Sequence, residues 1–126
     1  MKKILTAAFC AAMASPALAQ GWPTGYEGVM VQGFYWDSYS DSQWKNLEKQ
    51  APELGSYFSL LWVPQSGKCL EEHNVMGYTP YYYFDQNSSF GSEAELRSMI
   101  RAMRQNGVGV LADVVVNLSL IHISEP

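Results

Sequence analysis

Aromatic rings occur beside acids and amides at two places in the sequence. Trp36 and Asp37 follow the apolar segment "VMVQGFY", and Tyr78 belongs to "GYTPYYYFDQN", where rings are interspersed with Gly, Pro, Asp and Asn. A sugar ring has an apolar face that stacks on aromatic side chains and an edge of hydroxyl groups that needs hydrogen bonds. The combination therefore suits a neutral, hydroxyl-rich ligand. The alternative is that the rings pack these segments onto neighbouring structure.

The first elements predicted around these residues are a strand, a helix and a second strand. Residues 29–36 are rich in β-branched and aromatic side chains, and residues 58–63 form a continuous apolar run. Between them, apolar residues recur at helical spacing on one face: Trp44, Leu47, Ala51 and Leu54. We expect Ser40 or Asp41 to cap this helix and Gly55 to end it.

A long connection, residues 64–91, precedes a second helix and a third strand. Connections of this length are uncommon in compact domains unless they carry function. The second helix opens with the capping-box pair Ser92 and Glu95. Its apolar face is formed by Leu96, Met99, Ile100 and Met103. Residues 108–116, "VGVLADVVV", are predicted to form the third strand.

The resulting β-α-β-α-β order predicts an α/β fold with a parallel sheet, because the later strands are apolar runs rather than alternating ones. Two architectures are compatible with it, an open doubly wound sheet and the start of a (β/α)8 barrel. The open sheet usually carries a glycine-rich phosphate turn after its first strand. This chain has "WDSYSDS" there, which disfavours a nucleotide site. In both architectures ligands bind at the carboxyl ends of the strands, where Trp36, the aromatic loop and Asn117 lie.

The start of the 126-residue chain is typical of an export signal. A basic "MKK", an apolar run and the small residues of "SPALA" predict a signal peptide over residues 1–19 and a secreted or periplasmic protein. Its removal takes two of the eight basic residues, leaving six against twelve acidic ones. This balance argues against nucleic acid or an anionic membrane as a partner. The sequence does not indicate an oligomeric state.

Four motifs extend this interpretation: "VQGFYWDS", "LWVPQS", "MGYTPYYYFDQNSSFG" and "GVGVLADVVVN". In this order and spacing, over about residues 27–117, the chain resembles secreted bacterial α-amylases of glycoside hydrolase family 13, a branch that includes plant-like members. The resemblance implies that residues 20–117 are the amino-terminal part of a TIM (β/α)8 barrel. It also implies endo-acting, retaining hydrolysis of α-1,4-glucosidic bonds in starch and malto-oligosaccharides.

The same resemblance assigns roles to four residues. Tyr78 matches the tyrosine that stacks on the sugar beside the cleaved bond, and Trp36 is expected to line the sugar cleft unless it packs the rim. Asp113 matches an aspartate that supports the active site. Asn117 matches a ligand of a structural calcium ion, a hard cation that prefers oxygen ligands. The family's nucleophile and acid/base are expected beyond residue 126, so no acid of this chain is assigned to catalysis.

Residues 118–126, "LSLIHISEP", do not continue the family pattern, which has a histidine where this chain has Leu118. We expect the family-like sequence to stop at Asn117 and the last nine residues to be a non-native tail. Two alternatives to an α-amylase remain open. One is another α-glucan hydrolase of the same family, and the other is a starch-binding protein without catalysis.

Overall fold

The centre of the protein is a parallel sheet. The computed structural model describes residues 26–70, 75–82 and 84–115, so the predicted signal peptide, Asn117 and the predicted tail lie outside the described residues. Three strands form the sheet in the order β1 (Met30–Gln32), β2 (Leu60–Val63) and β5 (Gly109–Ala112). Both pairings are parallel, which confirms the prediction made from the apolar runs.

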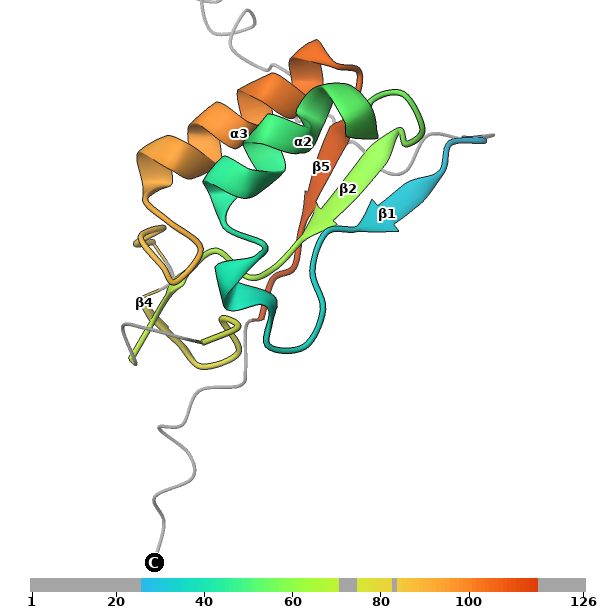
Figure 1. The fold of residues 1–126 in the computed structure, drawn as a ribbon. Coiled ribbons are helices and arrows are strands. Elements are labelled where there is room, and N and C mark those ends of the chain that lie inside the picture. The colour runs from blue at the N-terminus through green and yellow to red at the C-terminus, as the bar shows by residue number, and fades with distance from the viewer. Residues whose placement is uncertain (1–25, 71–74, 83, 116–126) are drawn as a thin grey trace, which may run out of the picture.

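Two helices cover one face of this sheet. Helices α2 (Trp44–Leu54) and α3 (Glu93–Gln105) lie side by side on the same side of the strands (Figure 1). In a doubly wound sheet the strand order reverses and the helices cover both faces. Here the strands follow one another in chain order, and both helices share one face. The arrangement is consistent with part of a (β/α)8 barrel.

The core lies between the helices and the sheet. Its buried residues come from both helices, from β2 and from the connecting segments: Phe34, Trp44, Leu47, Ala51, Leu61, Val63, Met76, Phe90, Leu96, Met99, Met103 and Val108. The apolar faces predicted for the two helices are thus confirmed. Ile100 and Leu54 are only partly buried and pack against the edge of this core.

The outer strands are shorter than predicted. The first was expected over residues 29–36, but β1 ends at Gln32; Gly33 still donates its N–H to the carbonyl of Trp62 at 2.8 Å, and the chain then turns away. The third was expected over residues 108–116, but β5 ends at Ala112. Its neighbour β2 still bonds to this segment through Val63, whose carbonyl accepts the N–H of Asp113 at 3.0 Å. Pro64, which follows, has no N–H to donate, and because alternate residues of a parallel strand bond to opposite neighbours, the missing donor is on the side of β1.

The cap predicted for the first helix is wrong, whereas that of the second is confirmed. Ser40 belongs to a short 3-10 helix, η2 (Ser38–Ser40), and α2 is preceded by Gln43 without a side-chain cap. In α3, the Ser92 Oγ accepts the N–H of Glu95 at 3.3 Å, and the Glu95 Oε2 accepts the N–H of Ser92 at 2.9 Å. This reciprocal capping box fixes where α3 begins.

The long connection, expected as a loop, contains a second sheet. Strands β3 (Lys68–Cys69) and β4 (Pro80–Tyr82) pair in antiparallel fashion. The connection also supplies Met76 and Phe90 to the core, and the Phe90 ring lies 5.3 Å from that of Trp44. It is therefore anchored to the helices rather than loosely attached. Within the described part of the chain, no helix is both long enough and apolar enough to cross a membrane.

Candidate functional site

Three of the four predicted site residues lie together although they are far apart in the sequence. The rings of Trp36 and Tyr78 are stacked, with centroids 6.1 Å apart and planes inclined by 12°. The side chain of Tyr78 is hydrogen-bonded to that of Asp113. Trp36 follows β1 and Asp113 follows β5, so the cluster lies at the carboxyl ends of the strands. Figure 1 shows the strand arrows pointing toward the end of the molecule where the loop carrying β4 lies.

The stacked pair presents aromatic surface to solvent. Trp36 is 75% exposed, and Tyr78, which is half-buried, covers part of it. A large exposed indole costs free energy unless a partner covers it. A ring held parallel to a second ring offers a flat, firmly placed surface, which is what stacking on a sugar requires.

Asp113 provides the polar part of the cluster. Burial raises the pKa of the Tyr78 hydroxyl, and the negative charge of Asp113 and the hydrogen bond between the two side chains raise it further. The ordinary tyrosine pKa of 10.0 already lies above neutrality, so this hydroxyl stays protonated at neutral pH and donates to the carboxylate. The bond ties the loop that carries Tyr78 to the end of β5.

A close backbone contact holds Tyr78 in place. Gly77 is buried with a φ of +92°, and a Cβ there would lie 2.6 Å from the carbonyl oxygen of Gln65. Gln65 itself is buried, and its Oε1 accepts the N–H of Gly67 at 3.3 Å. The segment after β2 and the segment before β4 are thus in direct contact at Gly77. Neither Gly77 nor Gln65 is among the site residues predicted from the sequence, although a glycine directly before Tyr78 is a usable signal.

We expect Gly77→Ala to weaken the sugar binding that the sequence predicts, as well as stability. The methyl group would force the backbone away from Gln65 and displace Tyr78, so the affinity for maltohexaose should fall about threefold to tenfold, part of what an aromatic contact supplies. The matched control is Gly107→Ala. Gly107 also has a positive φ, +78°, but no atom lies within 4 Å of a Cβ placed there.

Both variants should lose about 1–2 kcal/mol of stability from the left-handed backbone. Isothermal titration calorimetry with maltohexaose and thermal unfolding would be measured for each. Equal affinities for the two variants would contradict the role given to Gly77.

The other rings of the aromatic loop are exposed. Tyr81, Tyr82 and Phe84 do not pack onto the described core, and Phe84 is 99% exposed. The Tyr81 and Tyr82 rings meet edge to face at 4.8 Å, and the Lys68 Nζ lies 5.9 Å from the Tyr82 ring centre. Exposure in a chain that holds only three strands of the central sheet does not test the alternative left open by the sequence, so packing of these rings onto the rim stays a prediction.

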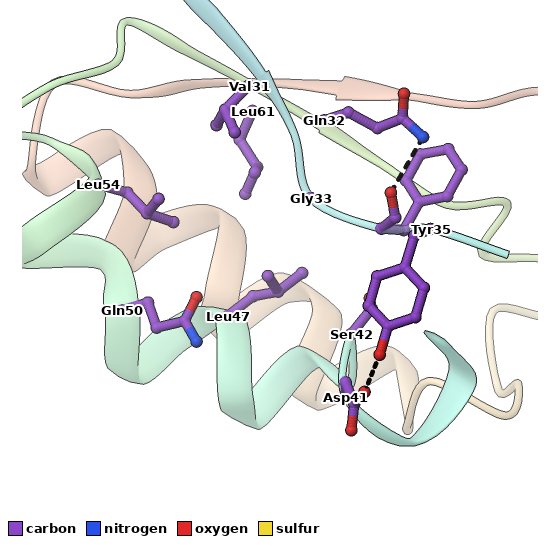
Figure 2. A pocket seen from close by; sticks show the side chains of 11 residues that line it. Val31, Gln32, Gly33, Tyr35, Asp41, Ser42, Leu47, Gln50, Leu54 and Leu61 are labelled. Atoms are coloured by element: carbon purple, nitrogen blue, oxygen red, sulfur yellow. Dashed lines mark hydrogen bonds between the residues drawn. The ribbon is translucent and has the colours of Figure 1, made fainter. Parts of the chain in front are cut away.

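A hollow of about 250 Å³ lies elsewhere, between β1 and α2. Figure 2 shows side chains of both elements around it, with Tyr35 reaching across to Asp41. None of the three clustered site residues lines this hollow. It was not foreseen because its lining comes from segments that only the fold brings together.

The predicted calcium site cannot be built from the described residues. Asn117 lies outside them, and residues 26–70, 75–82 and 84–115 contain no group of three or more His, Cys, Asp or Glu side chains arranged to hold a metal ion. The described donors therefore do not fit a calcium ion by themselves. Calcium stays a prediction.

Comparison with known proteins finds α-amylases and related glucan hydrolases. No family model matches the chain. The probable α-amylase 2 of Arabidopsis thaliana is 34% identical over 90 residues, which are 71% of this chain and 21% of that protein. The glucan 1,4-α-maltotetraohydrolase of Roseateles saccharophilus is also 34% identical, over 93% of this chain and 25% of that protein. This chain thus spans about a quarter or less of the length of these relatives.

Solved structures share the fold. The α-amylase I of Eisenia fetida, a mutant of which was solved with maltohexaose, superposes with a TM-score of 0.59 at 24% identity over 71% of this chain and 18% of that one. Among sequence and structure relatives, α-amylases and glucan hydrolases recur. The resemblance noted in the sequence is confirmed at this level, with homologues from a plant as well as from bacteria.

Proposed function

We propose that the protein carrying this segment hydrolyses α-1,4-glucosidic bonds within starch and malto-oligosaccharides, with retention of anomeric configuration. The observation that supports it best is the stack of Trp36 on Tyr78 beside Asp113, at the carboxyl ends of parallel strands. The relatives, an α-amylase and a glucan 1,4-α-maltotetraohydrolase, bear names that point to the same class of substrate. The barrel to which the strands contribute would be a TIM barrel, with this segment as its first β-α-β-α-β portion.

In this proposal the described residues bind and orient the sugar. Tyr78 and Trp36 stack on sugar rings, and Asp113 positions Tyr78 through its hydroxyl. Retaining hydrolysis needs two carboxyl groups about 5–5.5 Å apart, a nucleophile and an acid/base. None of the described acids is assigned to either role, because the family resemblance places both carboxyl groups beyond residue 126; Asp113 instead interacts with Tyr78.

The test uses the complete protein encoded by the gene. Reducing sugar released from starch would be measured, and the anomeric form of the first product followed by NMR. We expect release, with the α-anomer formed first. Binding of maltohexaose without release would favour the non-catalytic starch-binding alternative, and neither binding nor release would overturn the proposal. Product lengths would separate an α-amylase from the maltotetraose-forming enzymes that are among the relatives.

Two accompanying proposals depend on sequence alone. The basic and apolar start of the chain supports export to the periplasm or the exterior, and the match at Asn117 supports a structural calcium ion. No chemical step is assigned to calcium, since the described residues do not form a site for it.

A further inference from the structure

Ser38 is a fully buried polar residue within an otherwise exposed turn. Its exposed fraction is 0%, whereas Trp36, two residues earlier, is 75% exposed. The Ser38 Oγ accepts the N–H of Tyr35 at 3.0 Å and the hydroxyl of Ser42 at 2.8 Å. The Ser38 N–H in turn donates to the carbonyl of Tyr35 at 3.1 Å. Two hydrogen bonds thus close the loop that contains Trp36 and Asp37.

This closed turn holds an unfavourable backbone conformation. Asp37 has a φ of +65°, which is the left-handed region and is costly for a residue with a Cβ. Such a conformation persists only when its surroundings fix it. Ser38 supplies two of the bonds that do so, one from its hydroxyl and one from its N–H. The far end of the turn is tied by the hydrogen bond of the Tyr35 hydroxyl to Asp41, which Figure 2 shows.

The turn determines where the Trp36 ring lies. Trp36 is preceded by Tyr35 and followed by Asp37, so both of its backbone neighbours are fixed by the interactions of this turn. With so little of the indole buried, side-chain packing alone holds it weakly. Its nearly parallel stacking on Tyr78 therefore depends on a backbone that presents the ring at the correct angle.

We propose that Ser38 is the positioning residue for Trp36: its hydroxyl holds the 35–38 turn closed so that the indole stays parallel to Tyr78 and ready to stack on a sugar. The inference rests on the proposed function. It assigns a role in sugar binding to Ser38, which is fully buried and so does not contact the sugar itself. Ser38 affects the affinity by keeping the Trp36 side chain in one orientation. A hydroxyl that only stabilised the fold would have no such link to Trp36.

The test is a double-mutant cycle in the complete protein, with maltohexaose as the probe. Ser38→Ala removes the acceptor of both the Tyr35 N–H and the Ser42 hydroxyl, and only the first of these bonds closes the turn around Trp36. Binding should therefore weaken about threefold to tenfold, the range expected for one lost hydrogen bond. In a Trp36→Ala background the same change should have almost no effect on affinity, because the ring that it positions is gone. The matched control is Ser42→Ala, which removes a second buried hydroxyl of the same network but leaves the Tyr35 N–H bonded to Ser38. It should change affinity less than Ser38→Ala.

A second measurement needs no ligand. The near-ultraviolet circular dichroism spectra of the wild type and of Trp36→Phe are compared, and the difference between them is the signal of the ordered Trp36 indole. In Ser38→Ala most of this Trp36 signal should disappear. The inference would be overturned if Ser38→Ala left the spectrum unchanged. It would also be overturned if Ser38→Ala reduced the affinity for maltohexaose equally in proteins with tryptophan and with alanine at position 36. Loss of binding in Trp36→Ala but not in Ser38→Ala would refute this inference alone. If the wild type does not bind maltohexaose, the proposed function fails, and the circular dichroism still decides the role of Ser38.

Discussion

Replacing Tyr78 by alanine should lower kcat/KM on starch by about tenfold to a hundredfold, a loss of about 1–3 kcal/mol of transition-state stabilisation. Three effects contribute. The ring that stacks on the sugar is lost, and Trp36 loses the ring against which it is stacked. The hydrogen bond to Asp113 is lost as well, which frees the end of β5 from the aromatic loop.

Two further variants separate these effects. Tyr78→Phe keeps the stacking surface and removes only the bond to Asp113, so its loss should be several-fold smaller than that of alanine. Tyr57→Ala is the matched control, because Tyr57 is 71% exposed and its ring contacts the neighbouring Phe58 rather than the site. Equal losses for alanine and phenylalanine at position 78 would show that the hydroxyl, not the ring, carries the effect.

Residues 20–126 expressed alone should show neither cooperative unfolding nor hydrolysis of starch. Leu61 and Val63 pack toward the helices, so the alternate residues Leu60 and Trp62 point to the other face of the sheet. On that face no described element covers the strands, and Met30 is 48% exposed. Each 100 Å² of apolar surface left uncovered forgoes roughly 2.5 kcal/mol of burial free energy, a large part of the 5–15 kcal/mol stability of a typical domain.

This prediction is checked by thermal unfolding followed by circular dichroism, together with a reducing-sugar assay. The complete protein in the same buffer is the control for both measurements. A sharp two-state transition in the short segment would contradict the stability argument. Activity above that of a mock preparation would contradict the expectation that the catalytic carboxyl groups lie outside this segment.

Sequence reasoning was most successful where a local pattern and the core agreed. The capping box at Ser92 was found because both of its partners lie within one helical turn, and the structure has both bonds. The parallel sheet followed from the apolar runs. The strand lengths could not be predicted because they depend on where a neighbour stops pairing. Pro64 ends β2 and removes a hydrogen-bond donor on the side of β1, although Pro64 and β1 are far apart in the chain.

The site was predicted only in part, for a related reason. Trp36, Tyr78 and Asp113 were named, and the fold brings them together, but their roles in binding stay predictions. The residues that hold them were not found. Ser38 and Gln65 are polar residues in segments that read as loops, and nothing in the sequence shows that they are buried. Their importance comes from contacts with Tyr35 and Gly77, which exist only once the turns have formed.

The order of the strands has a consequence for how the chain is made. Each strand of the central sheet pairs with the one that comes before or after it in the chain, and α2 packs on α3 without an intervening helix. A chain with this order can add one strand and one helix at a time as it leaves the ribosome, because each new unit finds its partner already synthesised. The apolar face of the sheet nevertheless stays uncovered while this part is being made, so this is the stage at which we expect a chaperone to bind the nascent chain.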